Sequence, residues 1–425
     1  MREMKDSGIE WIGNIPATWE RCKIKNVISS IGSGTTPTSS NIDYYNSEDI
    51  CWIQSGDLYK TSYISNTAVS LSAKALHLSA LQIYAAPFIV VAMYGASVGN
   101  IAISTIDGCS NQACCCIKPD TNNDLKFMYY WLSMCKIDFL SQSIGGGQPN
   151  ISQSKIKNQF YYRPQLSEQK VIANFLDSKC SEIDAISADI QKEIETLEQY
   201  KRSVITEAVT KGLNPDAEMK DSGIEWVGNI PAHWDVHPLY YYFSERKRKN
   251  YLGEEQNLLS LSYGKVIRKD INTSEGLLPD SFNGYNIIEP GDIVLRLTDL
   301  QNDKRSLRTG LVTEHGIITS AYVTLKAAKE VVPEYFHYLL HAYDVMKVLY
   351  NMGNGVRQGL NYSELSKLHI VAPPIDEQKN IAAYLDAKCK EIESIIESKK
   401  QQLTVIDSYK KSLIYEYVTG KKEVV

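Results

Sequence analysis

The chain has 425 residues, of which 43% are hydrophobic and 22% charged, and its formal net charge is −5. This balance is typical of a globular protein with room for two cores, and it argues against a uniformly basic nucleic-acid binder. The longest apolar run, residues 83–96, contains Pro87 and is too short to span a bilayer. Because the first residues hold no apolar signal segment, we expect a cytoplasmic protein without membrane contact.

One segment near the start of the chain occurs twice. Residues 4–19 read MKDSGIEWIGNIPATW, and residues 219–234 read MKDSGIEWVGNIPAHW, 215 residues later. An almost identical return at this distance indicates a duplicated unit. We expect the segment to join each domain to the rest of the chain through its tryptophans: Trp11, Trp19, Trp226 and Trp234.

The first globular segment follows Trp19 and is rich in Gly, Ser, Thr, Asn and Tyr. Short apolar runs between turn residues predict strands at residues 50–53, 88–92, 100–103, 113–117 and 160–162. Apolar residues at helical spacing predict a helix over 125–140. Cys114, Cys115 and Cys116 fall in one predicted strand, where successive side chains point to opposite faces. We therefore expect them to pack in a core, because they cannot converge on one metal ion.

Two long helices are predicted, one over 167–212 and one that begins at 376. Each opens with a capping residue followed by Glu-Gln-Lys, at Ser167 and at Asp376, shortly after proline. Apolar residues then recur in steps of three and four, as in a coiled-coil seam. The expected seam is Leu176, Ile183, Ile186, Ile190, Ile194, Leu197, Val204 and Ala208 in the first helix, and Leu385, Cys389, Ile392, Ile396, Leu403, Ile406, Leu413 and Tyr417 in the second. The two helices match at an offset of 209 residues, as Leu176 and Leu385 illustrate.

These patterns predict an α+β fold with two similar strand-rich domains related by pseudo-two-fold symmetry. The domains are separated by the two long helices, which form an antiparallel coiled coil. The predicted divisions are a first domain with its lead-in at 1–166, a first spacer helix at 167–212, a second domain with its lead-in at 213–375, and a second spacer helix with a C-terminal tail at 376–425. The helices are near copies whereas the globular parts have diverged.

Catalytic motifs are missing from the sequence. It holds no phosphate-binding GxxxxGK[ST] loop, no GxGxxG between a strand and a helix, and no HExxH, GxSxG or Asn-Pro-Pro-Tyr. Pro279-Asp280 followed by Glu377-Gln-Lys379 is a weak nuclease-like signal, because the same Glu-Gln-Lys also opens the other helix at Glu168. We therefore predict no catalytic residue and no metal site.

A binding role fits the pattern better. Two similar domains held apart by paired helices could address two sites separated along duplex DNA. Loops rich in Ser, Thr, Asn, Gln, Tyr and Arg suit phosphate and base-edge contacts, although the same residues also form ordinary solvated loops. Charge alone does not decide, since residues 20–166 carry 9 acidic and 11 basic side chains.

Several motifs occur in a fixed order. They are GIEWIGNIPATW and GIEWVGNIPAHW, Gly-Ser-Gly-Thr-Thr-Pro37, Trp52-Ile-Gln-Ser-Gly-Asp-Leu58, Gly147-Gln-Pro-Asn-Ile-Ser152, and the helix entries Arg163-Pro-Gln-Leu-Ser-Glu-Gln-Lys-Val-Ile172 and Ala372-Pro-Pro-Ile-Asp-Glu-Gln-Lys-Asn-Ile381. With these motifs the sequence resembles the DNA-specificity subunit of Type I restriction–modification enzymes over essentially its whole length. The three adjacent cysteines and the low charge of the first domain are not part of that family pattern.

The resemblance implies that each domain is a target recognition domain that reads one half of a bipartite, asymmetric site in double-stranded DNA. It implies that the helices fix the unread spacer and dock two methyltransferase subunits, with restriction/translocase subunits as further partners. It also implies that this chain is not an enzyme and binds no cofactor. S-adenosylmethionine, ATP and magnesium would then belong to the partner subunits.

Loop residues close to the matched motifs are our predicted DNA contacts. In the first domain they are Thr35, Thr36, Gln54, Tyr94, Asn111, Gln112, Gln148 and Asn150; in the second they are Tyr263, Lys265, Arg296, Lys304, Arg305, Arg308, Arg357, Gln358 and Asn361. Arg357 could pair with guanine O6 and N7 or contact the DNA backbone, and both possibilities stay open. Four helix residues are predicted to be exposed and to contact methyltransferases or the spacer, with a solvated face as the alternative: Lys201, Arg202, Lys410 and Lys411.

Two other classes of function compete with this one. The chain could be a coiled-coil scaffold whose two domains bind ligands other than DNA, in which case salt-sensitive duplex binding is not expected. It could also be an enzyme with its own methylase or nuclease activity, which labelled S-adenosylmethionine offered to the purified chain would reveal.

Overall fold

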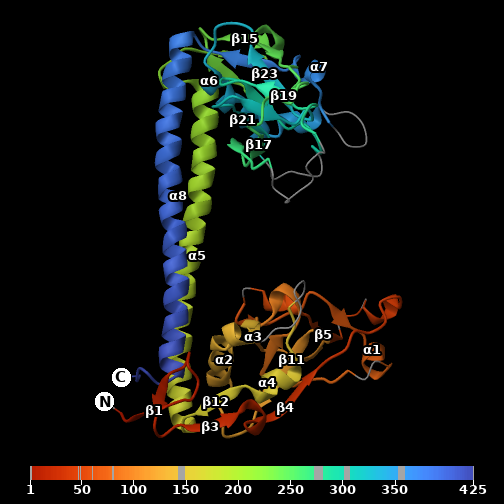
Figure 1. The fold of residues 1–425 in the computed structure, drawn as a ribbon, viewed down its shortest axis with the longest axis vertical. Helices are drawn as coiled ribbons and strands as arrows, with labels where there is room; N and C mark the ends of the chain where they lie inside the picture. The colour runs from red at the N-terminus through yellow and green to blue at the C-terminus, as the bar shows by residue number, and fades with distance from the viewer. Residues whose placement is uncertain are drawn as a thin grey trace. The chain divides into compact units, whose positions relative to one another are not determined.

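The computed structural model describes residues 2–45, 47, 49–59, 61–78, 81–141, 149–271, 281–300, 307–352 and 359–424 (Figure 1). The chain forms two compact units, Met1–Ile190 with Gln401–Val425 and Gln191–Lys400. Each unit therefore combines one strand-rich domain with its lead-in and with parts of both long helices. This differs from the division into four consecutive segments, because the helices pack against the domains at their ends. The expected α+β fold class, with two strand-rich domains and two long helices, is confirmed.

In the first unit the central feature is a five-stranded sheet in the order β4-β11-β8-β9-β6. The strands are β4 Ile28–Ser33, β6 Tyr63–Ile64, β8 Phe88–Ala92, β9 Ile101–Ser104 and β11 Cys114–Pro119. A second sheet has β5 Ile50–Ile53 between β10 Gly108–Ser110 and β7 Ser70–Leu71. α2 Leu125–Met134 contacts the five-stranded sheet, and α3 Lys136–Ser141 follows it. The single helix predicted over 125–140 is thus two helices, which are separated at buried Cys135.

The three adjacent cysteines lie on β11 as predicted. Cys114 and Cys116 pack into one cluster of buried residues and Cys115 into another, so the side chains do point to opposite faces. Burial raises the pKa of the Cys116 thiol to about 12, and the other two thiols are also shifted upward by burial. These are neutral packing residues. Across the described ranges no group of three or more His, Cys, Asp or Glu side chains could hold a metal ion.

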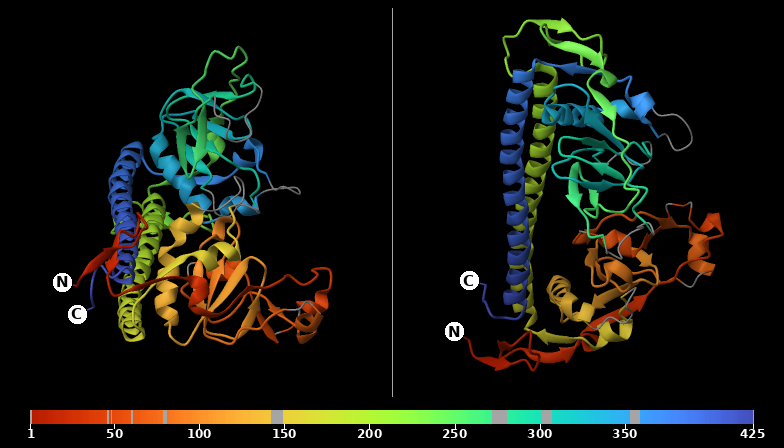
Figure 2. Two further views of the ribbon diagram at one scale, coloured as in Figure 1. Left: turned by 60° about the horizontal axis from the view of Figure 1, so that its bottom comes forward. Right: turned by 45° about the horizontal axis from the view of Figure 1, so that its top comes forward.

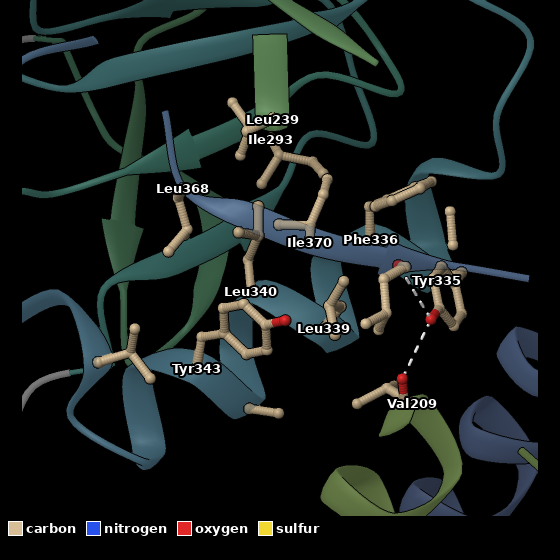
Figure 3. Packing of buried hydrophobic residues seen from close by; sticks show 14 of the residues in the cluster. Val209, Leu239, Ile293, Tyr335, Phe336, Leu339, Leu340, Tyr343, Leu368 and Ile370 are labelled. Atoms are coloured by element: carbon tan, nitrogen blue, oxygen red, sulfur yellow. Dashed lines mark hydrogen bonds between the residues drawn. The ribbon is translucent and has the colours of Figure 1, made fainter. Parts of the chain in front are cut away.

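The second unit repeats the strand order of the main sheet. Its four-stranded sheet has the order β16-β23-β20-β21, which corresponds to β4-β11-β8-β9. The strands are β16 Phe243–Glu245, β20 Ile293–Leu295, β21 Thr309–Leu311 and β23 Val323–Ala327. α6 Pro333–Val345 packs Tyr335, Phe336 and Leu339 into the same core as Ile293 and the end of α5 (Figure 3). The Tyr335 hydroxyl donates to the backbone oxygen of Val209 at 3.1 Å.

The remaining strands of the second unit form two further pairs. β17 Leu259–Ser262 and β18 Lys265–Arg268 form a hairpin, and β19 Asn286–Ile288 pairs antiparallel with β22 Gly316–Ile318. In the first unit the comparable additional sheet contains a parallel pair, β5 and β10, and in the second unit Leu258 and Ile317 likewise form a parallel bridge. Short helices complete the domains: α1 Ala73–Leu78, α4 Gln153–Asn158 and α7 Tyr362–Leu365.

The two long helices are α5 Leu166–Lys211 and α8 Ile375–Val418, close to the predicted bounds. Within each unit they lie side by side and run antiparallel (Figure 2). In the second unit Glu193 pairs with Lys399 and Lys201 with Glu393, and in the first unit Asp184 pairs with Lys410. The seam prediction is wrong at Ile186, whose side chain is 52% exposed. Among the described helices none is long and apolar enough to cross a membrane.

Each repeated segment forms a small hairpin beside the end of a long helix. The strands are β1 Met4–Asp6 with β2 Asn14–Pro16, and β13 Met219–Asp221 with β14 Asn229–Pro231. The hairpin leads into a strand that pairs with the strand before a helix: β3 Glu20–Lys23 with β12 Phe160–Arg163, and β15 Asp235–Pro238 with β24 His369–Ala372. Trp19 and Trp234 are buried, as an anchoring role requires, whereas Trp11 and Trp226 are each 40% exposed.

Candidate nucleic-acid interface

In the first unit the ends of several strands meet at one edge of the domain, which we call the first recognition edge. It consists of residues 34–36, 54, 93–97, 111–113 and 149–150. β4 and β8 both run antiparallel to β11, so their last residues lie beside the first residues of β11. β5 and β10 are parallel and end together, with the amide of Asn111 bonded to the oxygen of Ile53 at 3.0 Å. Sheet topology therefore gathers loops that are far apart in the sequence.

Seven of the eight DNA-contact residues predicted in the first domain are described, and all lie at this edge. The Thr36 hydroxyl donates to the side-chain oxygen of Gln112. Tyr94 is exposed and forms an antiparallel bridge with Asn150. Half-buried Gln54 and Asn111 partly use their side chains to cap turns, which restricts how they could contact a ligand. The indole of Trp52 donates a hydrogen bond to the backbone oxygen of Thr35 at 3.3 Å. Gln148 lies outside the described residues.

A second recognition edge occupies the corresponding place in the second unit. It consists of residues 246–249, 263–265, 296–298, 307–309 and 359–361. One bond marks the correspondence: the amide of Ile151 donates to the oxygen of Met93 at 2.9 Å, and the amide of Leu360 donates to the oxygen of Leu297 at 2.9 Å. The same frame therefore presents different loops in the two units.

The predicted residues of the second domain occupy this edge unevenly. Half-buried Arg296 follows β20, and Tyr263 is at the tip of the β17–β18 hairpin with its side chain 89% exposed. The ammonium group of Lys265 lies 3.4 Å from Glu393 of α8. The side chain of Asn361 caps α7 by accepting from the amide of Glu364 at 3.1 Å. Four predicted residues lie outside the described residues: Lys304, Arg305, Arg357 and Gln358.

The backbone makes the hairpin tip unusual. Tyr263 has a φ of 46°, and the following Gly264 has a φ of 79°. A non-glycine residue pays roughly 1–2 kcal/mol to adopt this left-handed region. The hairpin also packs closely on the edge, because a Cβ at Gly310 would approach the Leu261 side chain to 2.5 Å. The hairpin tip at Gly264 therefore lies against Leu307, and the neighbouring Tyr263 side chain is exposed.

Arg308 is a correction to the predicted contacts. Its side chain is fully buried, and its guanidinium donates to the backbone oxygens of Arg296, Thr298 and Asp299 at 3.1, 2.7 and 3.1 Å. Its Nε donates to the hydroxyl of Tyr350 at 3.2 Å. A guanidinium used in this way holds loops together and is not exposed for contact with a ligand.

Some residues of the second edge are not among the predicted contacts. The segment after β16 contains Lys247 and Arg248, whose side chains are exposed, and it corresponds in place to Gly34–Thr36 after β4. The run of four basic residues at 246–249 is the sequence feature that could have predicted this segment as part of the edge. Carboxylates moderate its charge, since Lys247 lies 2.8 Å from Glu245 and Arg248 lies 3.4 Å from Glu289.

The four helix residues predicted to be exposed fall into two kinds. Lys201 and Lys410 are half-buried and pair across the helices with Glu393 at 2.5 Å and with Asp184 at 2.6 Å, which corrects the expectation of exposure. Arg202 and Lys411 are exposed. Lys201 and Lys410 are equivalent positions of the duplicated helices, so the same pairing is built twice. Their contact with a partner subunit stays a prediction.

The sequence matches a known protein family over most of its length. The family model for the Type I restriction modification DNA specificity domain matches residues 16–196 and 286–405, which is more than half of the chain. This chain belongs to that family. The family is one of DNA recognition rather than of catalysis.

Curated proteins similar to this chain are specificity subunits of type I restriction enzymes. Over 283 residues the chain is 27% identical to a putative type I restriction enzyme MjaX specificity subunit of Methanocaldococcus jannaschii, and the match covers 65% of this chain and 62% of that protein. It is 24% identical to the MjaIX specificity subunit of the same organism over 97% of this chain and 95% of that one. A chain of a solved structure described as the structural basis of complex assembly and conformational transition of the type I R-M system has a TM-score of 0.70, at 13% identity, over 95% of this chain and 98% of that chain. That likeness shows a shared fold.

Proposed function

We propose that this chain is the non-catalytic DNA-recognition subunit of a Type I restriction–modification complex. Each domain reads one half of a bipartite, asymmetric site in double-stranded DNA through its recognition edge. The paired helices set the length of the unread spacer and dock two methyltransferase subunits. S-adenosylmethionine, ATP and magnesium act in the methyltransferase and restriction/translocase subunits, not in this chain.

The observation that carries the proposal is the pair of recognition edges on one duplicated frame. The main sheets share their strand order. They also share one backbone hydrogen bond, from the amide of Ile151 to the oxygen of Met93 in the first unit and from the amide of Leu360 to the oxygen of Leu297 in the second. The loops they present differ: the first edge offers hydroxyl and amide groups, such as Thr36 and Gln112, and the second includes Arg296 and Lys247. A constant frame with different loops is what two unlike half-sites require, because base identity is read by side-chain donors and acceptors.

The helices suit the role of a ruler. α5 has 46 residues, which corresponds to about 70 Å of helix. Duplex DNA repeats about every 34 Å, so this length spans roughly two turns. Ion pairs between α5 and α8, such as Lys201 with Glu393, repeat along their length and oppose sliding of one helix along the other.

Methylation mapping tests the proposal. DNA from cells that express this chain with its partner subunits should carry methylated bases in two short motifs separated by a fixed gap. Substitution of Arg296 by Ala should relax one of the two motifs and leave the other unchanged. A single uninterrupted motif would contradict the two-edge arrangement. Purified chain given labelled S-adenosylmethionine should methylate nothing, and its duplex binding should weaken steeply with salt, unlike that of a scaffold for other ligands.

A further inference from the structure

The second unit contains an open groove of about 750 Å³ at the end of α5. We call it the α5-end groove. It is lined by Tyr200, Val204, Glu207, Ala208, Lys211, Gly212, Leu213, Asn214, Pro215, Met219, Asn229 and Tyr384. Its volume is within the range of about 300–1,000 Å³ that is typical of small-molecule sites. The groove is therefore large enough to take more than one side chain.

Large apolar side chains surround this groove without covering one another. Tyr200 and Tyr384 are 48% and 42% exposed, and Leu213 and Met219 are 42% and 39% exposed. Ala208 lies buried among them and contributes only a methyl group. A contiguous exposed apolar surface with a polar rim is typical of a protein-binding site.

The duplicated chain shows what fits such a site. The equivalents of Ala208 and Tyr384 in the first unit, at the 209-residue offset, are Tyr417 and Phe175. Their rings pack against each other with centroids 4.5 Å apart. In the first unit an aromatic side chain of the chain itself thus occupies the position that alanine leaves open in the second.

The rim shows a similar difference. Glu416 of the first unit is paired with Lys422 at 2.8 Å. Its equivalent in the second unit is Glu207, which is exposed and forms no ion pair with any residue in the described part of the chain. The groove therefore offers both an aromatic wall and a carboxylate that forms no ion pair within the described residues, with exposed Lys211 one helical turn away.

We propose that the α5-end groove receives an aromatic side chain of one methyltransferase subunit, stacked on Tyr384 as Tyr417 stacks on Phe175. A basic side chain next to that ring meets Glu207. This inference rests on the proposed function, since it names where the partner is held. It also makes the two units unequal: the methyltransferase seated at the second unit is bound more tightly than the one seated at the first.

Filling the groove with this chain's own ring tests the inference. Ala208→Tyr should fold, with thermal stability equal to or above that of the unchanged chain, because it copies the arrangement at Tyr417. In a titration with the purified methyltransferase subunit, the unchanged chain should show two affinities. Ala208→Tyr should weaken the tighter one by at least about 10-fold, since a buried aromatic anchor dominates an interface. Glu198→Tyr, at an exposed position of the same helix outside the groove, is the matched control and should bind as the unchanged chain does.

A second measurement does not depend on how the variant folds. A photo-crosslinking amino acid at position 213 should capture the methyltransferase subunit, and the modified peptide of that subunit should contain Phe, Tyr or Trp. If Ala208→Tyr is folded and binds both methyltransferases as before, or if the crosslink joins two copies of this chain, the inference is wrong. If the unchanged chain binds no methyltransferase at all, the proposed function itself fails.

Discussion

The indole Nε1 of Trp234 donates a hydrogen bond to Oε1 of Glu377 at 3.1 Å, which ties the repeated segment to the first turn of α8. Trp19 makes the same bond to Glu168 in the first turn of α5, at 3.2 Å. Both indoles are buried. The repeated segment therefore serves as a clamp between each domain and the helix that follows it.

Removal of the acceptor should weaken this clamp. Glu377→Ala leaves a buried indole N–H without its bond, so we expect the free energy of unfolding to fall by about 1–3 kcal/mol. Glu377→Gln keeps a hydrogen-bond acceptor, so its free energy of unfolding should fall by less. Urea unfolding followed by tryptophan fluorescence measures both. Glu254→Ala, at an exposed loop position, is the control, and an equal loss of stability in the control and in Glu377→Ala would show that the Trp234–Glu377 bond is not stabilising.

Arg308→Ala should act on stability rather than directly on DNA. The buried guanidinium bonds three backbone oxygens, and its loss leaves them without donors. We expect a loss of roughly 3 kcal/mol or more in the free energy of unfolding. Differential scanning calorimetry would show this as a lower melting temperature. A fully stable variant that fails only in DNA binding would restore Arg308 as a DNA contact.

Tyr263 allows stability and binding to be separated. Because its φ of 46° suits glycine, Tyr263→Gly should leave the melting temperature unchanged or raise it. If the ring contacts DNA, the same variant should bind target duplex more weakly by about 1–3 kcal/mol. Fluorescence anisotropy at fixed salt measures the affinity. Tyr240→Ala removes another exposed ring, away from the recognition edge, and should not change it.

Arg357 gives a test of base reading. Arg357→Ala should weaken DNA binding by roughly 1–3 kcal/mol and relax the methylated sequence if the guanidinium pairs with guanine. If it contacts a phosphate, affinity should fall for all sequences alike. Unchanged affinity together with an unchanged methylation motif in the reconstituted complex would remove Arg357 from the interface.

Two histidines of α6 should make the second unit sensitive to acid. Burial lowers the pKa of His337 and of His341 to about 4 from an ordinary 6.5, and the neighbouring side chains of His337, Lys201 and Arg202 further disfavour charge on His341. Between pH 4 and pH 6.5 the unfolded chain therefore binds more protons than the folded chain does. The free energy of unfolding is highest above pH 6.5 and falls as pH falls toward 4, by roughly 3 kcal/mol or more for the two coupled histidines together.

Unfolding free energies at pH 7 and pH 5 measure this effect. His337→Leu should reduce the difference between the two pH values, because leucine cannot take up a proton in the unfolded state. His77→Leu, at an exposed position of the first unit, should leave the difference unchanged. An unaltered pH dependence in the α6 variant would show that its histidine is not held neutral.

Local patterns were sufficient for the elements of the frame. The long helices and most of the strands of the first unit could be predicted because their signals, apolar spacing and capping residues, lie within one stretch of chain. The alternation of Cys114, Cys115 and Cys116 between two cores is also a local property of a strand. Ile186 is exposed despite its place in the apolar pattern, because apolar spacing alone does not say which side of a helix meets its partner.

The sequence by itself determined the duplication, the family pattern and the order of elements, because identical segments and periodic spacing are properties of the chain read in line. Only the tertiary structure decided which loops share an edge, that Arg308 is held by oxygens of residues 296–299, and that Ala208 and Tyr384 line one groove. The physical reason is that burial and close approach depend on segments far apart in the sequence. An arginine or an alanine has no fixed role until those segments surround it.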